Sequence, residues 1–208
     1  MSDNKIKVGI INLGINNIFS ITNAYKKIGC EVKIINKKRN LSNFNIVVIP
    51  GIGSFKNGMR KLKLLKIQDD LKKFLENPKR HLIGICLGMQ LFFEFSYEFG
   101  KIKGMGLIKG SVIPFDIKKT IKKTNNNWND VIFKNKLFFK KISNKKFYFT
   151  HSFFCKPLIK KEIYALTNFN KFNYCSIVKK DNIIGLQMHP EKSGKNGLEL
   201  LMKINNFL

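Results

Sequence analysis

Short runs of β-branched residues alternate with stretches of helical length through the first half of the chain, and this alternation limits the fold more than any other feature. Helices are expected within residues 21–29, which end at Gly29, within 58–75, and at 87–96 (LGMQLFFEFS). A buried strand is expected at KVGII (7–11), and further strands are expected at EVKIIN (31–36), FNIVVIP (44–50) and HLIGI (81–85). Such an alternation predicts an α/β fold, in which a mostly parallel central sheet is flanked by helices.

The second half of the chain is dominated by strands, which are expected to extend the sheet with antiparallel pairs. These strands are expected at GLIKGSVIPF (106–115), KKFYFTHSFF (145–154), EIYALTNF (162–169), YCSIVKK (174–180) and NIIGLQMHP (182–190). The polar segment TIKKTNNNWND (120–130) is expected to be a loop, and a last helix follows Gly194. Because no repeat or linker interrupts the pattern, residues 1–208 are expected to form one domain.

The formal net charge of +26 raises the question of a polyanionic partner. The lysines are spread along the whole chain, and only three arginines occur, although arginine is the preferred reader of phosphate and guanine. Lysine, asparagine, isoleucine and phenylalanine are abundant and have AT-rich codons, so a compositional bias accounts for the charge. Nucleic acid is therefore not expected as a partner.

The chain carries no sign of export, membrane insertion or metal binding. Its apolar stretches are shorter than the roughly 18 residues that cross a bilayer, and its first residues lack a secretory signal. The four cysteines form no CxxC pair, so neither a structural zinc site nor a disulfide framework is predicted. We expect a cytoplasmic protein that needs no metal and no cofactor.

Cys86 stands between two glycines in GICLGMQ (84–90), directly after a predicted strand and before a predicted helix. This pattern has the form of a nucleophile elbow, in which small residues on both sides permit a strained turn. The start of the helix favours a thiolate at this position, and the N–H of Leu87 becomes a candidate oxyanion donor. The competing interpretation is a small residue packed at a strand end.

A cysteine nucleophile needs a base, and the chain has three histidines. His81 precedes a strand and is expected on the surface. His189 follows a strand in QMHPEKS, and Pro190 favours an extended conformation there. Glu191 can then turn toward the imidazole and orient it, as the third member of a triad does.

A third motif, PGIGSF (50–55), again follows a predicted strand. Gly51 and Gly53 permit backbone angles that are closed to other residues, so this loop can present N–H groups to an anion. At the carboxyl end of a parallel strand, beside the elbow, it is a candidate for the second half of an oxyanion hole.

These three motifs, in this order and spacing, resemble the class I (triad) glutamine amidotransferases, and more narrowly the glutaminase subunits of imidazole glycerol phosphate synthase. The resemblance runs nearly end to end and includes NLGINNIFSITNA, GLIKGSV, FYFTHSFF and IIGLQMHPEKSGKNGLELL. It implies a hydrolase that releases ammonia from glutamine through a cysteine thioester. It also implies a heterodimer with a separate (β/α)8-barrel cyclase subunit, which has lyase activity and uses the ammonia in histidine biosynthesis.

The resemblance also assigns roles to individual residues. The triad is Cys86, His189 and Glu191; Leu87, Gly51, Ile52 and Gly53 hold the oxyanion. Gln90, Glu98, His151 and Ser152 surround the substrate, with Glu98 at its ammonium group. Residues that match the docking surface and the point where ammonia leaves are Asn12, Asn17, Trp128, Tyr148 and Lys192.

The chain departs from the family pattern near this docking surface. It has TNNNWN at 124–129 where the family usually reads PHMGWN, and Asn16 stands where a glycine is usual. Two other interpretations remain open at this point. One is a sibling amidotransferase that serves pyridoxal phosphate, anthranilate or guanylate synthesis, although the PGIGSF loop differs from theirs. The other is a basic binding protein on the same scaffold, which would not need an intact triad.

Overall fold

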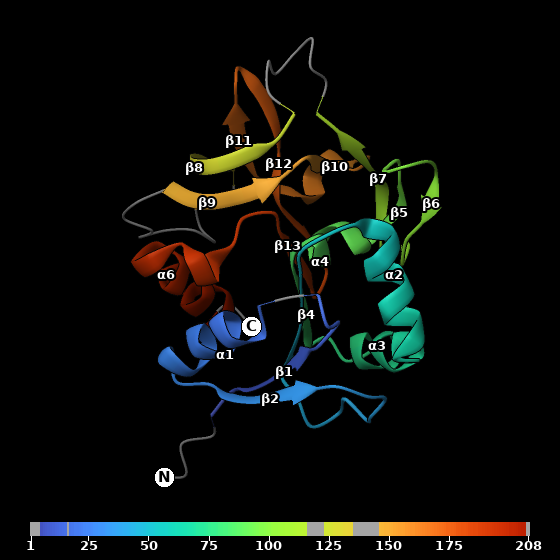
Figure 1. Cartoon of the computed structure of the whole chain (residues 1–208). Coiled ribbons are helices and arrows are strands. Elements are labelled where there is room, and N and C mark those ends of the chain that lie inside the picture. The colour runs from blue at the N-terminus through green and yellow to red at the C-terminus, as the bar shows by residue number, and fades with distance from the viewer. Residues whose placement is uncertain (1–4, 16, 116–122, 135–145, 207–208) are drawn as a thin grey trace.

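The computed structural model describes residues 5–15, 17–115, 123–134 and 146–206 (Figure 1). The predicted parallel part of the sheet is confirmed. It consists of β1 (Lys7–Ile11), β2 (Glu31–Ile35), β3 (Ile46–Gly51), β4 (His81–Cys86) and β13 (Ile183–Leu186). Because these strands run in one direction, the residues that follow them gather at the same edge of the sheet.

The antiparallel extension is confirmed as well, with β5 paired in parallel to β7 as the exception. Its strands are β5 (Phe93–Ser96), β6 (Ile102–Lys103), β7 (Ile108–Pro114), β8 (Asn125–Phe133), β9 (Lys146–His151), β10 (Phe153–Pro157), β11 (Ile163–Phe169) and β12 (Phe172–Lys180). Among the described residues, ten of the thirteen strands follow one another in the order β2-β1-β3-β4-β13-β12-β10-β7-β5-β6. From this path β11 branches off β12, and β8 and β9 follow β11.

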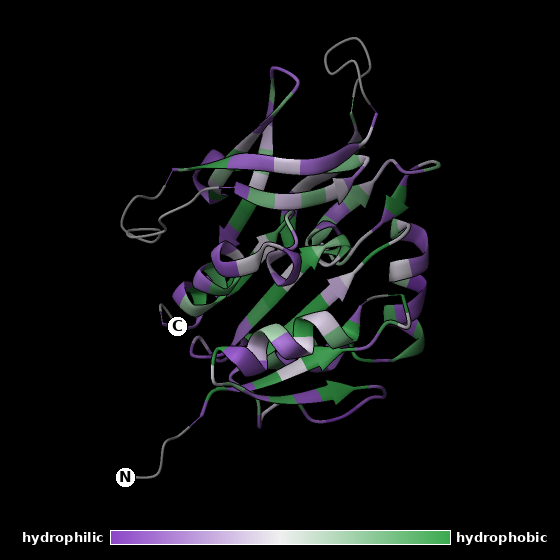
Figure 2. Cartoon of the chain, turned by 60° about the vertical axis from the view of Figure 1, so that its left-hand side comes forward, coloured by the Kyte–Doolittle hydropathy of each residue, from purple (hydrophilic) through white to green (hydrophobic). Residues whose placement is uncertain are grey.

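Helices cover both faces of the parallel strands. Those described are α1 (Ile18–Lys27), α2 (Phe55–Leu64), α3 (Gln68–Leu75), α4 (Leu87–Leu91) and α6 (Gly194–Asn206), with the 3-10 turns η1 (Lys160–Glu162) and η2 (Pro190–Lys192). α1 and α6 lie on one face and α2 and α3 on the other (Figure 1). Figure 2 shows hydrophobic residues along the central strands and hydrophilic residues on the outer sides of the helices.

Each face of the sheet has its own apolar core. Tyr25 of α1 and Leu200 of α6 are buried on one face, and Leu62 of α2 and Leu71 of α3 on the other. Burial of one large apolar side chain contributes about 1.5–3 kcal/mol to folding. The two cores therefore hold both helix layers against the strands and fix the edge at which the predicted motifs emerge.

Two of the expected helices are shorter than predicted. The segment 58–75 is not one helix: it contains most of α2 and all of α3, which are separated near Lys66, whose φ of 52° lies in the left-handed region. The segment 87–96 is helical only as far as Leu91, and Phe93–Ser96 forms β5. The backbone N–H and C=O groups of β5 bond to β6 and β7, whereas in a longer helix they would have bonded to other residues of the same helix.

The expectation of a loop at 120–130 was wrong for its second half, which begins β8. A run of polar residues lacks the alternation of apolar and polar residues by which a strand is predicted from sequence. In the structure, β8 nevertheless pairs with β9 over six positions, including Trp128 with Tyr148. The amide of Asn125 also donates to the hydroxyl of Tyr174 at 2.9 Å. Residues 120–122 and Asn16 lie outside the described residues.

The expected surface position of His81 was also wrong. His81 is the first residue of β4, which lies between β3 and β13, and only 8% of its surface is exposed. Burial, with a smaller effect from Lys179, lowers the pKa of His81 to about 4. This histidine is therefore neutral at physiological pH.

The turn from β4 into α4 is tight because α4 lies against the end of β3. A Cβ atom on Gly88 would lie 1.7 Å from the carbonyl oxygen of Ile49, and one on Gly84 would lie 2.6 Å from the backbone of Gly88. Cys86 between them has φ 53° and ψ −108°, a strained conformation for a residue with a side chain. The elbow that the motif predicted is confirmed, and both glycines are required by the backbone contacts.

Substitution of Gly88 by alanine is expected to destabilise the protein by about 3 kcal/mol or more, because the new methyl group meets a main-chain carbonyl that cannot move aside. Gly58→Ala in α2 is the matched control. Its methyl group would lie 3.1 Å from the flexible side chain of Leu91, so we expect a change within about 1 kcal/mol. Urea unfolding of the two variants measures the difference, and equal losses would contradict this account.

Candidate active site

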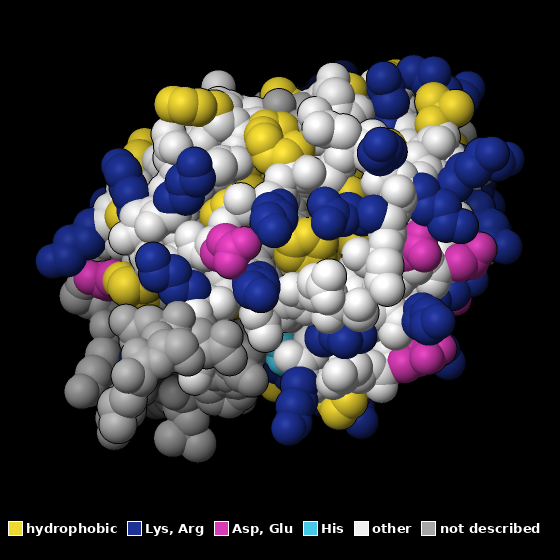
Figure 3. Space-filling view, turned by 90° about the horizontal axis from the view of Figure 1, so that it is seen from below, with side chains coloured by type: hydrophobic (Ala, Val, Ile, Leu, Met, Phe, Trp, Pro, Cys, Tyr) yellow, Lys and Arg dark blue, Asp and Glu magenta, His cyan; other side chains and the backbone are white. Residues whose placement is uncertain are grey.

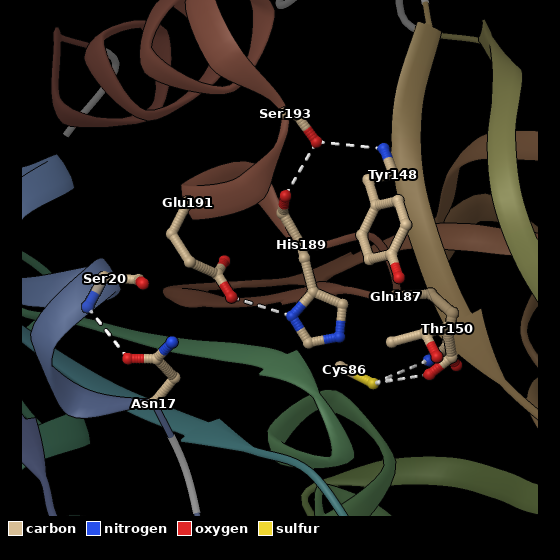
Figure 4. A network of polar contacts seen from close by, with 9 residues as sticks. All are labelled: Asn17, Ser20, Cys86, Tyr148, Thr150, Gln187, His189, Glu191 and Ser193. Carbon is tan, nitrogen blue, oxygen red and sulfur yellow. Dashed lines mark hydrogen bonds and ion pairs between the residues drawn. The ribbon is translucent and has the colours of Figure 1, made fainter.

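The predicted motifs converge where β3, β4 and β13 end. These strands are neighbours, and their register places Gly51 beside Cys86 and Ile85 beside Leu186. The residues that follow β13 therefore reach the elbow. Figure 4 shows His189 above Cys86, with Glu191 on the other side of the imidazole ring.

His189 is held by its neighbour on η2. Its Nδ1 atom lies 2.8 Å from Oε1 of Glu191, and both side chains are buried. Since a carboxylate can only accept, Nδ1 carries a proton. The Nε2 atom is buried and has no hydrogen-bond partner among the described residues, and it faces the sulfur of Cys86 (Figure 4). A free ring nitrogen beside a thiol is the arrangement that proton transfer requires.

The charge state of His189 is set by opposing effects. Burial lowers its pKa, but the negative charge of an ionised Cys86, the hydrogen bond to Glu191 and the negative charge of Glu191 outweigh burial and raise the pKa to about 10. At neutral pH the imidazole is therefore protonated and has a proton to donate. The site can hold an ion pair that already contains an acid and a nucleophile.

Two further groups contact the sulfur of Cys86. The carbonyl oxygen of Thr150 on β9 lies 3.9 Å away and can accept a hydrogen bond from the thiol. The amide nitrogen of Gln187 lies 3.7 Å away and donates to the sulfur. Sequence analysis missed Gln187, although its position directly after β13 and two residues before His189 carried the same signal that selected His189.

A cavity of about 410 Å³ opens in front of Cys86. The four residues expected around the substrate line it, and they come from three segments of the chain: Gln90, Glu98, and the adjacent His151 and Ser152. One oxygen of the Glu98 carboxylate accepts a hydrogen bond from the backbone N–H of Phe55. The carboxylate is thus fixed at the wall of the cavity, where it offers a negative charge to a cation.

His151 is a neutral residue whose ring nitrogens are both engaged. Nδ1 lies 2.8 Å from the carbonyl oxygen of Phe153 and must donate to it, so Nε2 accepts from the hydroxyl of Tyr174 at 3.2 Å. Burial lowers the pKa of His151 to about 3, opposed by the bond to Phe153 and assisted by the charge of His189. His151 therefore shapes the cavity wall without a free nitrogen for a ligand.

Three of the four residues expected at the oxyanion line the cavity, namely Ile52, Gly53 and Leu87. Leu87 follows Cys86 as the first residue of α4. The N–H of Ile52 donates to the carbonyl oxygen of Ile15 at 3.1 Å, so in this structure it is turned away from an anion in the cavity. Gly51 ends β3 beside Cys86 and is buried behind the side chain of Leu87.

Three of the residues expected at a docking surface form a cluster at the rim of the cavity. The indole of Trp128 contacts the ring of Tyr148 edge to face at 6.1 Å, and the ammonium of Lys192 lies 5.8 Å from the centre of that ring. The hydroxyl of Tyr148 donates to the side chain of Asn126 at 2.8 Å. Trp128 stays 48% exposed, which leaves a large apolar surface beside the cavity mouth.

Asn12 and Asn17 lie at the carboxyl end of β1, and their side chains serve the local backbone. Asn12 accepts from the N–H of Gly14 and donates to Asn36, each at 2.9 Å. Asn17 caps α1 by accepting from the N–H of Ser20 at 3.1 Å. Figure 4 shows Asn17 and Tyr148 on opposite sides of the pair formed by His189 and Glu191.

A second cavity, also of about 410 Å³, lies between β7, β10, β11 and β12 and is lined mainly by apolar side chains. It contains two thiols, those of Cys155 and Cys175. Burial raises the pKa of both thiols, assisted at Cys155 by nearby thiols and opposed at Cys175 by Lys134 and a backbone hydrogen bond. The described lining of this cavity includes no histidine, aspartate or glutamate that could act as a base for either thiol. The two cavities have the same volume, so the candidate active site is assigned to Cys86 on the chemistry of the neighbouring groups.

Comparison with protein families gives one match over almost the whole chain. A family model described as "Glutamine amidotransferase class-I" matches residues 9–205. Among curated proteins, the chain is 40% identical to "Imidazole glycerol phosphate synthase subunit HisH 2" of Methanococcus maripaludis, over 97% of this chain and 98% of that protein. It is 37% identical to "Imidazole glycerol phosphate synthase subunit HisH" of Helicobacter hepaticus, over 98% of each chain.

Solved structures share the fold at lower sequence identity. "Structure of PurLQS from Thermotoga maritima" aligns with a TM-score of 0.76 and 20% identity, over 98% of this chain and 99% of the other. "Crystal structure of glutamine amidotransferase" aligns with a TM-score of 0.70 and 18% identity, over 94% of this chain and 96% of the other. At these identities the likeness establishes the arrangement of strands and helices.

Proposed function

The chain belongs to the class I glutamine amidotransferase family, and we propose that it is the glutaminase subunit of an imidazole glycerol phosphate synthase. One observation carries this proposal: Cys86 lines a cavity beside a buried His189–Glu191 pair, in a chain that aligns end to end with synthase subunits. In this role the chain hydrolyses glutamine to glutamate and ammonia. A separate cyclase subunit then uses the ammonia in histidine biosynthesis.

Acylation follows from the charges of the site. The thiolate of Cys86 attacks the side-chain amide carbon of glutamine, and the carbonyl electrons move to oxygen. The N–H of Leu87 stabilises this oxyanion. The N–H of Ile52 can join it only after its bond to Ile15 breaks. The imidazolium of His189 then donates its Nε2 proton to the departing nitrogen, so ammonia leaves and a glutamyl thioester remains.

Deacylation reverses the role of His189. The neutral imidazole takes a proton from water, and the resulting hydroxide attacks the thioester carbon. The C–S bond breaks, glutamate is released, and the thiolate–imidazolium pair is restored. Glu191 holds the imidazole through Nδ1 in both half-reactions. Gln90, Glu98 and Ser152 keep the substrate in place, with the carboxylate of Glu98 at its ammonium group.

The cyclase subunit docks over the rim cluster of Trp128, Tyr148 and Lys192. A half-exposed tryptophan beside a fixed tyrosine offers an anchor of the kind that dominates protein interfaces. Asn12 and Asn17 extend this surface along the β1–α1 connection. Since Tyr148 and Lys192 also line the cavity, ammonia that leaves the cavity passes between them into the partner.

We place this activity in the cytoplasm. All four cysteines are free, which is the state expected in a reducing compartment. Among the described residues there is no helix with the length and apolar character needed to cross a membrane.

Two other functions are less well supported. A sibling amidotransferase would share the fold and the triad, but the curated relatives given above carry the name of the histidine pathway enzyme. A basic binding protein would be expected to concentrate its charge. Figure 3 instead shows Lys and Arg side chains dispersed over one face of the molecule, among uncharged and acidic groups.

Glutamate release from glutamine tests the proposed function directly. We expect little activity from the chain alone and strong activity when the cyclase and its nucleotide substrate are both present. Cys86→Ala should abolish release, because no other group can form the thioester. Glutamate release at the same rate with and without the cyclase would indicate an amidotransferase of another pathway. Glutamate release by Cys86→Ala at the wild-type rate would exclude this residue from the mechanism.

The two partners of the thiolate are expected to differ in their contribution. His189→Ala removes the acid and base and should lower kcat by at least about 10³-fold, whereas Glu191→Gln removes only orientation and charge and should cost about 10- to 100-fold less. Steady-state kinetics of the complex measures both variants. Equal losses, or a larger loss for Glu191→Gln, would contradict these roles.

Trp128→Ala is expected to weaken assembly with the cyclase by about tenfold or more, while the chain stays folded. Ile132→Ala is the matched control, because Ile132 is also on β8 and 53% exposed but pairs with β11, away from the rim cluster. Calorimetric titration of each variant with the cyclase gives the two affinities. An unchanged affinity for Trp128→Ala, or an equal loss for Ile132→Ala, would exclude the anchor.

A further inference from the structure

A chain of hydrogen-bonding groups connects Cys86 to the interior of the sheet. The amide nitrogen of Gln90 lies 3.0 Å from the carbonyl oxygen of Phe153 and 3.3 Å from the amide oxygen of Gln187. The amide nitrogen of Gln187 in turn lies 3.7 Å from the sulfur of Cys86. Gln187 is fully buried and, among the described residues, is not part of the cavity wall.

The direction of this chain follows from its first member. A backbone carbonyl can only accept, so the nitrogen of Gln90, and not its oxygen, must face Phe153. The second hydrogen of that nitrogen then points to Gln187, whose oxygen must accept it. The nitrogen of Gln187 is left toward Cys86, where it presents an N–H to the sulfur. The orientation of both amides is thus determined by one carbonyl on β10.

We propose that Gln187 is a catalytic residue that donates a hydrogen bond to the thiolate of Cys86 and so favours the ionised nucleophile. The kinetic consequence rests on the proposed glutaminase function; the effect on the thiolate does not. The carbonyl of Thr150 acts in the opposite sense, since it accepts from the thiol and repels an anion. The N–H of Gln187, a neutral donor buried from water, offsets the effect of this carbonyl on the charge of the sulfur.

This role differs from that of the groups that already define the site. His189 changes its protonation state during the reaction, and Gln90 lines the cavity where substrate binds. Gln187 has no titratable atom and is not among the described residues of the cavity wall; its nitrogen donates to the sulfur, and its oxygen accepts from Gln90. The other titratable groups around the sulfur remain in place when Gln187 is replaced: His189, Glu191, His151, Tyr148, Glu98, Tyr174, Cys155 and Lys192.

The test is the rate of alkylation of Cys86 by iodoacetamide between pH 5 and 10 in the full chain, read at Cys86 by mass spectrometry. Gln187→Met keeps the volume and removes the donor, and we expect its rate at pH 6 to fall about tenfold, with the midpoint of the profile about one pH unit higher. Gln187→Glu keeps the shape and places a carboxylate beside the sulfur, so its midpoint should rise further. Met188→Leu, a buried neighbour changed at nearly constant volume, should leave the profile unchanged.

The order of the midpoints decides the proposal. We expect the pH midpoint of alkylation to be lowest in the wild type, higher in Gln187→Met and highest in Gln187→Glu. A Gln187→Met profile equal to that of wild type would overturn the proposal, even if glutamine hydrolysis fell. If Gln187→Met does not fold, as seen by circular dichroism, Gln187→Glu alone carries the test, and an unshifted profile in that variant is equally decisive.

Kinetics of the complex with the cyclase separates this role from substrate binding. Gln187→Met should lower kcat for glutamine about tenfold and leave KM within about twofold, because Gln90 keeps its shorter bond to the carbonyl of Phe153 when its bond to Gln187 is lost. A raised KM with unchanged kcat would assign Gln187 to substrate binding and overturn the proposal. A wild-type complex that releases no glutamate would refute the proposed function, and the alkylation profiles would still decide the contact between Gln187 and Cys86.

Discussion

The close approach of α4 to the end of β3 is the constraint on which the site depends. Because Gly88 has no side chain, the helix that follows Cys86 can lie against the carbonyl of Ile49. This contact forces the chain to turn within one residue, and Cys86 takes the left-handed backbone conformation that directs its sulfur out of the strand. The two apolar cores of the sheet hold β3 and β4 rigidly enough to maintain that strain.

The parallel register then supplies the partners of the sulfur. β13 lies beside β4, so the residues that follow it, Gln187 and His189, reach the elbow from one side. β9 brings the carbonyl of Thr150 from another side. Each partner acts on the charge of the sulfur in a different way. In the proposed mechanism His189 pairs with the thiolate, Gln187 donates to it, and Thr150 favours the thiol.

The large positive charge has no visible part in this arrangement. The groups around the sulfur are a histidine, a carboxylate and neutral amides, and Lys192, which lines the cavity, lies over the ring of Tyr148. Across the face shown in Figure 3 the basic side chains are dispersed. Exposed charges of this kind are screened by salt over about 10 Å, so they affect solubility and encounter more than chemistry at a buried thiolate.

The amino-acid sequence by itself determined the parallel strands, the elbow at Cys86, and the positions of His189 and Glu191, because these depend on local apolar runs and on spacing along the chain. Only the tertiary structure decided the short length of α4, the strand at Asn125–Phe133 and the burial of His81, since each depends on pairing with distant strands. The same holds for the contact of Gln187 with the sulfur and for the engagement of the Ile52 amide by Ile15. Spacing along a strand places a residue at an edge of the sheet; which atom it meets there is fixed by neighbours that the chain brings in from elsewhere.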